Sequence, residues 1–277
     1  MKNLLFLCVA FSVLHESFMT AFINAQDKHG TTALICAAQS GILHHVESLI
    51  DAHAHLDIQN ENGTTALMKA SMYGHTEIAM RLISSRAKLD VQDWCGNTAL
   101  IKAAACGNSD IVRLLIEFKA DLTLQNDSGE TALIAAAMFG QTESVKLLIP
   151  AMKAEYEPRF YIDRRNVDVD LVRQAMIDDL IHPLDMQNTM GRTALMEAAL
   201  YGHAEIVRFL IDAGADPCVQ DNDGETAHFL VMHGCLTTTA EILAALENRQ
   251  NLCGEKKHKN KRHTSSDHVR KKRKTRS

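Results

Sequence analysis

A short sequence motif returns along this chain every 33 residues. It has the form Asp/Asn-x-x-Gly-x-Thr-Ala-Leu, with His in place of Leu in the last copy, and it begins at Asp27, Asn60, Asp93, Asn126, Asn188 and Asp221. One interval differs, because 62 residues separate Gly129 in the fourth copy from Gly191 in the fifth. A repeat of about 20–50 residues is typical of a solenoid, in which each unit buries its apolar face only against its neighbours. The period therefore predicts an elongated stack rather than a globular core.

Two short apolar segments follow each motif, and we predict that both are helices. The motif threonine can cap the first helix through its hydroxyl group. A glycine follows the first segment where a helix ends in left-handed backbone, at Gly41, Gly74, Gly107, Gly140 and Gly202. The second segment places apolar residues at i, i+3 and i+4, as in Val112, Leu115 and Ile116, so it presents one apolar stripe.

With these motifs the sequence resembles the ankyrin-repeat family, whose unit is a β-turn followed by two helices. The resemblance covers residues 27–150 and 186–246. It implies a mainly α fold, an α-solenoid of helix–turn–helix repeats joined by β-hairpin loops, with one helical insertion. The repeats are expected at about 27–59, 60–92, 93–125, 126–150, 186–220 and 221–246, with the insertion at 151–185.

Two features depart from the family pattern. The family's Thr-Pro-Leu-His reads Thr-Ala-Leu-Ile or Thr-Ala-Leu-Met in most copies, so apolar packing is expected where the histidine would form a hydrogen bond. The Gly-Ala-Asp that closes the second helix survives only at Gly214, and His53, Arg86 and Lys119 stand at the equivalent glycine position. A left-handed residue other than glycine costs about 1 kcal/mol, so these three loops are predicted to be strained.

The inserted segment contains an amphipathic stretch with Val169, Val172, Met176 and Leu180 on one side. Insertions in repeat proteins often lie on the binding face. Two interpretations stay open: an ordered helical excursion without a binding role, and an added part of the binding surface.

The resemblance implies that the hairpin tips and the ends of the first helices face a concave groove. Large side chains are concentrated at these positions, and aromatic residues, Met and Arg are enriched in binding interfaces. The candidate protein-binding residues are Tyr73, Trp94, Phe139, Tyr201, Met72, Met138, Met190 and Arg192. The alternative is that Met72 and Met138 only seal the space between neighbouring helices. Carboxylates at the tips favour a basic protein or peptide as partner.

The amino terminus allows two interpretations. Residues 1–26 contain an apolar run, Leu4 to Leu14, of the length of a signal-peptide core and too short to span a bilayer. Cleavage between Ala25 and Gln26 is then expected to leave the repeats intact, and the protein is secreted or exported. The other interpretation is an N-terminal cap helix, in which case the protein is cytoplasmic or nuclear.

Residues 247–277 are predicted to form a disordered basic tail. The last 24 residues carry 11 Lys/Arg against two carboxylates, whereas the rest of the chain is acidic. Two clusters supply most of this charge: Lys256, Lys257, Lys259, Lys261 and Arg262, then Arg270, Lys271, Lys272, Arg273 and Lys274. Such clusters suit an import receptor or a polyanion.

The sequence holds no P-loop, nucleophile elbow or zinc-ligand spacing. We therefore predict no catalytic residue, cofactor, metal, small-molecule substrate or transmembrane segment. The cysteines are expected to be unpaired, with Cys36 as a small core residue. The predicted function is a noncatalytic scaffold that binds a protein or peptide in the groove. The alternatives are a secreted or translocated effector that uses the same groove, and a nuclear or nucleic-acid-associated protein tethered by its tail.

Overall fold

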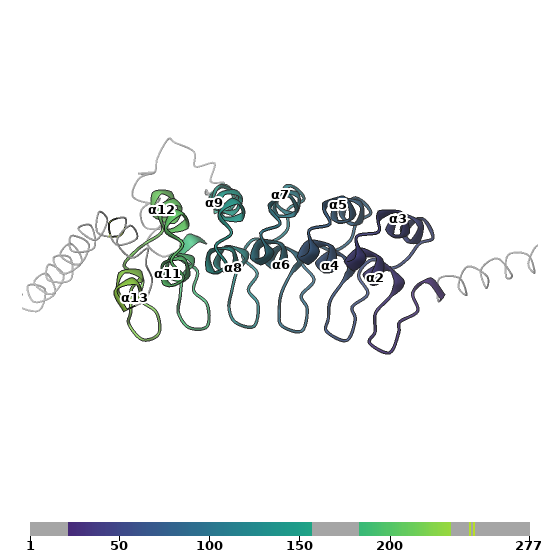
Figure 1. Ribbon diagram of the computed structural model, residues 1–277, viewed down its shortest axis with the longest axis horizontal. Coiled ribbons are helices and arrows are strands. Elements are labelled where there is room, and N and C mark those ends of the chain that lie inside the picture. The colour runs from purple at the N-terminus through teal and green to yellow at the C-terminus, as the bar shows by residue number, and fades with distance from the viewer. Residues whose placement is uncertain (1–21, 157–182, 234–243, 245, 247–277) are drawn as a thin grey trace, which may run out of the picture.

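The computed structural model describes residues 22–156 and 183–233, together with residues 244 and 246. Its helices form two layers that run along an elongated stack, with the hairpin loops projecting from the inner layer (Figure 1). The inner helices are α2 (Ala33–Ser40), α4 (Ala66–Tyr73), α6 (Ala99–Cys106), α8 (Ala132–Met138), α11 (Ala194–Leu200) and α13 (Ala227–His233). The outer helices are α3 (Leu43–Asp51), α5 (Thr76–Ser84), α7 (Ser109–Glu117), α9 (Thr142–Tyr156) and α12 (Ala204–Ala213). The predicted α-solenoid is confirmed, and within the described ranges the loops contain turns and no strand.

The predicted caps form at both ends of the helices. The hydroxyl oxygens of Thr32, Thr65, Thr98, Thr131 and Thr193 accept the backbone N–H three residues on, at 3.2–3.3 Å. Left-handed backbone follows the outer helices at His53, Arg86 and Lys119, with φ of 62°, 71° and 68°. These caps satisfy helix-end groups that have no partner within the helix.

The core runs through the whole stack as one continuous cluster. Alanines and leucines of the inner helices pack between units, and the outer stripes are buried as predicted, for example at Val112 and Leu115. The stripe is weaker in the first unit, where Leu49 and Ile50 are only partly buried. This difference arises because no described helix lies on the open side of α2 and α3.

The extra chain between the fourth and fifth units leaves their packing intact. Helices α8 and α11 are in contact, as are α9 and α12. Helix α9 continues through Pro150 to Tyr156, beyond the predicted boundary of repeat and insertion, and the short 3-10 helix η1 (Pro183–Asp185) returns the chain to the stack. The amphipathic stretch at 169–180 lies outside the described residues.

Two expectations about cysteines are wrong. Cys36 is exposed rather than part of the core, because it lies on the open side of α2, which no described unit covers. Cys218 is disulfide-bonded, whereas Cys36, Cys95 and Cys106 are free as predicted. The spacing of the cysteines along the sequence did not reveal that Cys218 is paired.

Candidate protein-binding surface

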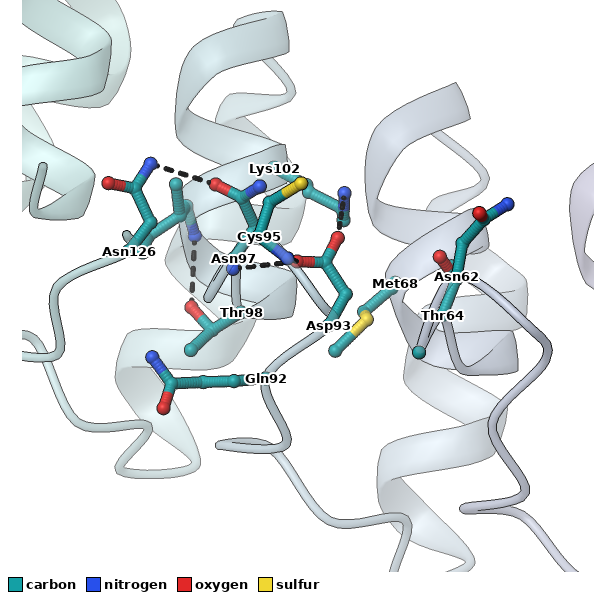
Figure 2. Close-up of polar contacts among 12 residues, drawn as sticks. Asn62, Thr64, Met68, Gln92, Asp93, Cys95, Asn97, Thr98, Lys102 and Asn126 are labelled. Carbon is teal, nitrogen blue, oxygen red and sulfur yellow. Dashed lines mark hydrogen bonds and ion pairs between the residues drawn. The ribbon is translucent and has the colours of Figure 1, made fainter. Parts of the chain in front are cut away.

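The hairpin tips are fixed by the Asp or Asn that begins each motif. In the third unit, Asp93 Oδ1 accepts the backbone N–H of Cys95 at 3.0 Å and that of Asn97 at 2.8 Å, while Oδ2 lies 2.7 Å from Lys102 Nζ (Figure 2). Asn126 of the next unit donates to Asn97 Oδ1 at 3.0 Å. One short side chain therefore sets the shape of the tip, and the next tip then packs against it.

The same position in the fifth unit carries a different polar pair. Asn188 Nδ2 donates to Glu197 Oε1 at 3.0 Å, and Glu197 is only 2% exposed. Burial raises the pKa of the Glu197 carboxyl, and the hydrogen bond from Asn188 and the charge of Arg192 offset part of that rise. Glu197 thus acts as a buried acceptor inside the unit and is not a group on the surface.

Adjacent tips are joined by backbone hydrogen bonds along the stack. The amide of Trp94 donates to the carbonyl of Asn62 at 3.1 Å, and equivalent bonds of 2.9–3.1 Å link the other tips. The Trp94 indole Nε1 also donates to the carbonyl of Glu61 at 2.6 Å. The Trp94 residue is nonetheless 68% exposed. The tryptophan is therefore anchored by its polar atom with its ring open to solvent.

An aromatic row lies at the other end of the inner helices. Tyr73, Phe139 and Tyr201 each stand just before the turn glycine of their unit, and they are 49%, 57% and 50% exposed. The equivalent residues of the first and third units are Ser40 and Cys106, both exposed. The repeat places these side chains in one line along the stack. The row is separate from Trp94, which lies on a hairpin tip, so the predicted aromatic residues occupy two edges of the surface.

The remaining candidates fall into two groups. Met72 and Met190 are exposed and extend the apolar surface at the helix end and at a tip, respectively, whereas Met138 is half-buried. The Arg192 side chain is 17% exposed, and its Nε lies 3.5 Å from Asp221 Oδ2 in the next tip. Arg192 therefore links two tips, and little of its side chain remains accessible.

Exposed carboxylates are frequent at the tips. Asp127 and Asp223 are exposed, and Glu61 Oε1 lies 2.7 Å from His29 Nδ1. At the first tip, the backbone amides of Thr31 and His29 lower the pKa of Asp27 by hydrogen bonding to its carboxylate. The tip edge therefore carries exposed carboxylates beside a smaller number of basic groups such as Lys28.

A set of polar residues that the sequence reasoning missed supports the aromatic row. From the second unit to the fifth, the residue after the turn glycine reaches the preceding unit and contacts a carbonyl at the end of its inner helix, as His75 does with Gln39 at 3.1 Å and Asn108 with Ser71 at 2.7 Å. Gln141 and His203 do the same. The His75 ring also stacks on Tyr73, with ring centroids 6.3 Å apart. These residues recur every 33 residues, except across the insertion, and this period in the sequence could have identified them.

Other kinds of site find no support in residues 22–156 and 183–233. No group of three or more His, Cys, Asp or Glu side chains in these ranges could hold a metal ion. None of the helices in these ranges is long and apolar enough to cross a membrane.

The fold and this surface define the class of the protein as an α-solenoid of stacked helix pairs. A family model described as ankyrin repeats in three copies matches residues 5–93 and 79–159, and an ankyrin-repeat model matches residues 190–222. These matches cover more than half of the chain, so the protein belongs to the ankyrin-repeat family.

Solved structures agree with this assignment. The chain is similar to the ankyrin repeat protein EF0377, with 28% identity, a TM-score of 0.61, and coverage of 78% of this chain and 96% of that one. It is equally similar to an ankyrin repeat domain from Acinetobacter baumannii AYE, with 28% identity, a TM-score of 0.60, and coverage of 77% and 95%. Ankyrin repeats generally mediate protein–protein interactions and are typically noncatalytic.

Proposed function

We propose that this protein is a noncatalytic scaffold that binds an extended, basic protein segment along its inner surface. The observation that carries the proposal is the aromatic row of Tyr73, Phe139 and Tyr201, which the repeat aligns and leaves about half exposed. Tyrosine and tryptophan bury large area at low entropic cost and dominate binding energy in many interfaces. A row of such residues along a rigid stack suits a partner that is itself extended.

The acidic tips supply the preference for a basic partner. Asp127 and Asp223 are exposed along the same edge as Trp94 and Met190. A basic segment that contacts this edge would gain long-range attraction, and its aliphatic and aromatic side chains would contact the apolar surface. We therefore expect bound sequences to combine Lys or Arg with apolar residues.

A displayed library of random peptides tests this function directly. Selection on the intact protein should enrich peptides that contain both basic and apolar residues. A variant with Tyr73, Trp94, Phe139 and Tyr201 all changed to Ala should bind the selected peptides at least tenfold more weakly. Its cooperative unfolding should be retained, because all four residues are about half exposed or more.

The outer layer offers a matched control. Met80, Phe118 and Phe209 are exposed apolar side chains on or next to the outer helices. Changing these three to Ala should leave peptide affinity unchanged. Equal losses in both variants, or selection of acidic peptides, would overturn the proposal. The exported-effector and nuclear alternatives rest on residues 1–25 and on the basic tail, most of which lie outside the described residues.

A further inference from the structure

In two units, the first residue of the motif contacts the residue nine positions later on the inner helix. In the third unit Asp93 Oδ2 lies 2.7 Å from Lys102 Nζ, and the two side chains are only 7% and 17% exposed (Figure 2). In the fifth unit Asn188 Nδ2 donates to Glu197 Oε1 at 3.0 Å. The first, fourth and sixth units carry uncharged residues at the later position, namely Cys36, Ala135 and Leu230. The first motif residue therefore supplies a partner to Lys102 and to Glu197.

The second unit differs, because its two residues are Asn60 and Lys69. The amide of Asn60 has no charge with which to neutralise a lysine. Its Oδ1 already accepts the backbone N–H of Asn62 at 3.0 Å and that of Thr64 at 2.9 Å. Among the residues that the structure describes, no carboxylate lies within 4.0 Å of Lys69 Nζ. Lys69 is only half-buried, so its charge is accessible to a bound molecule.

Lys69 lies beside the aromatic row. It precedes Tyr73 by one helical turn, so the two side chains share a face of α4. Lys69 Nζ lies over the Tyr73 ring, 6.0 Å from its centroid. Glu61, on the hairpin tip of the same unit, is paired with His29 at 2.7 Å. A segment bound along the row would therefore cover a lysine that has no counter-charge, which costs free energy unless the segment brings one.

We propose that Lys69 selects one Asp or Glu side chain within an otherwise basic bound segment. This inference rests on the proposed function and adds the place of one acidic residue to it. One ammonium group matches one carboxylate, whereas a phosphate group, with a charge of about −1.5 to −2, favours a cluster of cations. The equivalent lysine of the next unit, Lys102, is held by Asp93. The segment stays basic overall, because its other charges meet the exposed carboxylates of Asp127 and Asp223.

The repeat also sets how far this acidic residue stands from the basic ones. Lys69 belongs to the second unit and Asp127 to the tip of the fourth, so two unit spacings separate them. Neighbouring helices pack roughly 10 Å apart, and an extended chain advances about 3.3 Å per residue. The Asp or Glu of the bound segment should therefore lie about six residues from a Lys or Arg.

Exchanging the first motif residue tests the inference without changing Lys69 itself. Asn60→Asp gives Lys69 the counter-charge that Lys102 has, and an aspartate keeps the two turn hydrogen bonds, as Asp93 does. Peptides selected on the intact protein should carry the acidic residue and should bind Asn60→Asp about fivefold more weakly. The same peptides with that residue changed to Asn or Gln should bind the two proteins equally. Lys69→Met, which removes the charge and keeps an unbranched side chain, should weaken binding by a similar factor.

Asp93→Asn is the matched converse, because it leaves Lys102 without its counter-charge. The second unit shows that this combination of Asn and Lys fits within a repeat. Peptides selected on Asp93→Asn should contain a second acidic residue about three residues from the first, since one unit spacing separates Lys69 from Lys102. Denaturant unfolding of each variant checks that the stack is retained.

Two results would overturn this inference and leave the proposed function standing. The first is equal binding of the selected peptides to the intact protein, Asn60→Asp and Lys69→Met. The second is selection of basic and apolar peptides that have no acidic residue at a constant spacing. In both cases binding would still depend on the aromatic row, as the fourfold Ala variant shows. Enrichment of no peptide on the intact protein would instead overturn the proposed function, and this inference with it.

Discussion

The buried carboxyl of Glu197 makes stability depend on pH. Its pKa is raised above the ordinary value of 4.5 by burial, so the unfolded chain ionises first as pH rises. The group's favourable contribution is therefore present below pH 4.5 and is lost as pH rises through the folded-state pKa. Changing Glu197 to Gln should raise the free energy of unfolding by roughly 1 kcal/mol at pH 7 and change it little at pH 4. Urea unfolding at the two pH values measures this difference. An equal change in the free energy of unfolding at both pH values would show that the hydrogen bond from Asn188 offsets the effect of burial on the Glu197 pKa.

Arg86 holds a left-handed backbone conformation with φ of 71°. Changing Arg86 to Gly should stabilise the protein by up to about 1 kcal/mol, because glycine adopts this conformation without strain. Ser84, two residues earlier and the last residue of α5, provides the control, since Ser84→Gly should destabilise by about 0.5 kcal/mol through loss of helix propensity. Denaturant midpoints of the two variants should move in opposite directions. If both variants are less stable than the original protein, the Arg86 side chain stabilises the fold by more than its left-handed backbone destabilises it.

At the scale of elements, stacking of the tips depends on close approach of backbone. A Cβ atom at Gly63 would lie 2.7 Å from Trp94 N and 2.9 Å from Asp93 Cα, whereas one at Gly224 would meet nothing within 4 Å. Both glycines have similar positive φ, 73° and 80°. Gly224→Ala should therefore cost about 1 kcal/mol for the backbone alone, and Gly63→Ala about 1–3 kcal/mol more for displacing the next tip. Thermal unfolding of both variants measures the difference, and equal losses would contradict the role assigned to stacking.

The elements show how far the sequence could predict the structure. Contacts inside one unit were predictable, because the threonine caps and the left-handed residues at His53, Arg86 and Lys119 depend only on position within the repeat. Contacts between units were harder to predict. The exposure of Cys36 depends on what precedes the first unit, and Arg192 turns toward Asp221 in the next tip. The aromatic row of Tyr73, Phe139 and Tyr201 is about half exposed, and its separation from Trp94 follows from the length of the inner helix.

For the whole molecule, the contacts across the insertion make the stack independent of the extra chain. Gln125 donates to the carbonyl of Gln187 at 2.9 Å, and the Thr189 amide donates to the carbonyl of Ser128 at 2.9 Å. Replacing residues 157–182 by a Gly/Ser segment of equal length should therefore preserve a single cooperative unfolding transition. The measurement is denaturant unfolding followed by circular dichroism and by Trp94 fluorescence. Two separate transitions would show that the native segment is needed to couple the two parts.

The paired amide contacts of the glutamines have a consequence for how such a chain can change in length. Gln59, Gln92, Gln125 and Gln187 each donate to the carbonyl of the glycine four residues later and to the carbonyl of the equivalent glutamine one repeat later, across intervals of 33 or 62 residues. Every junction presents the same amide donor and carbonyl acceptors. A copied unit inserted between two existing units would therefore find hydrogen-bond partners on both sides. Duplication or loss of whole units therefore needs no newly selected interface. The molecule can be lengthened or shortened by recombination in steps of one unit while each surviving junction keeps its chemistry.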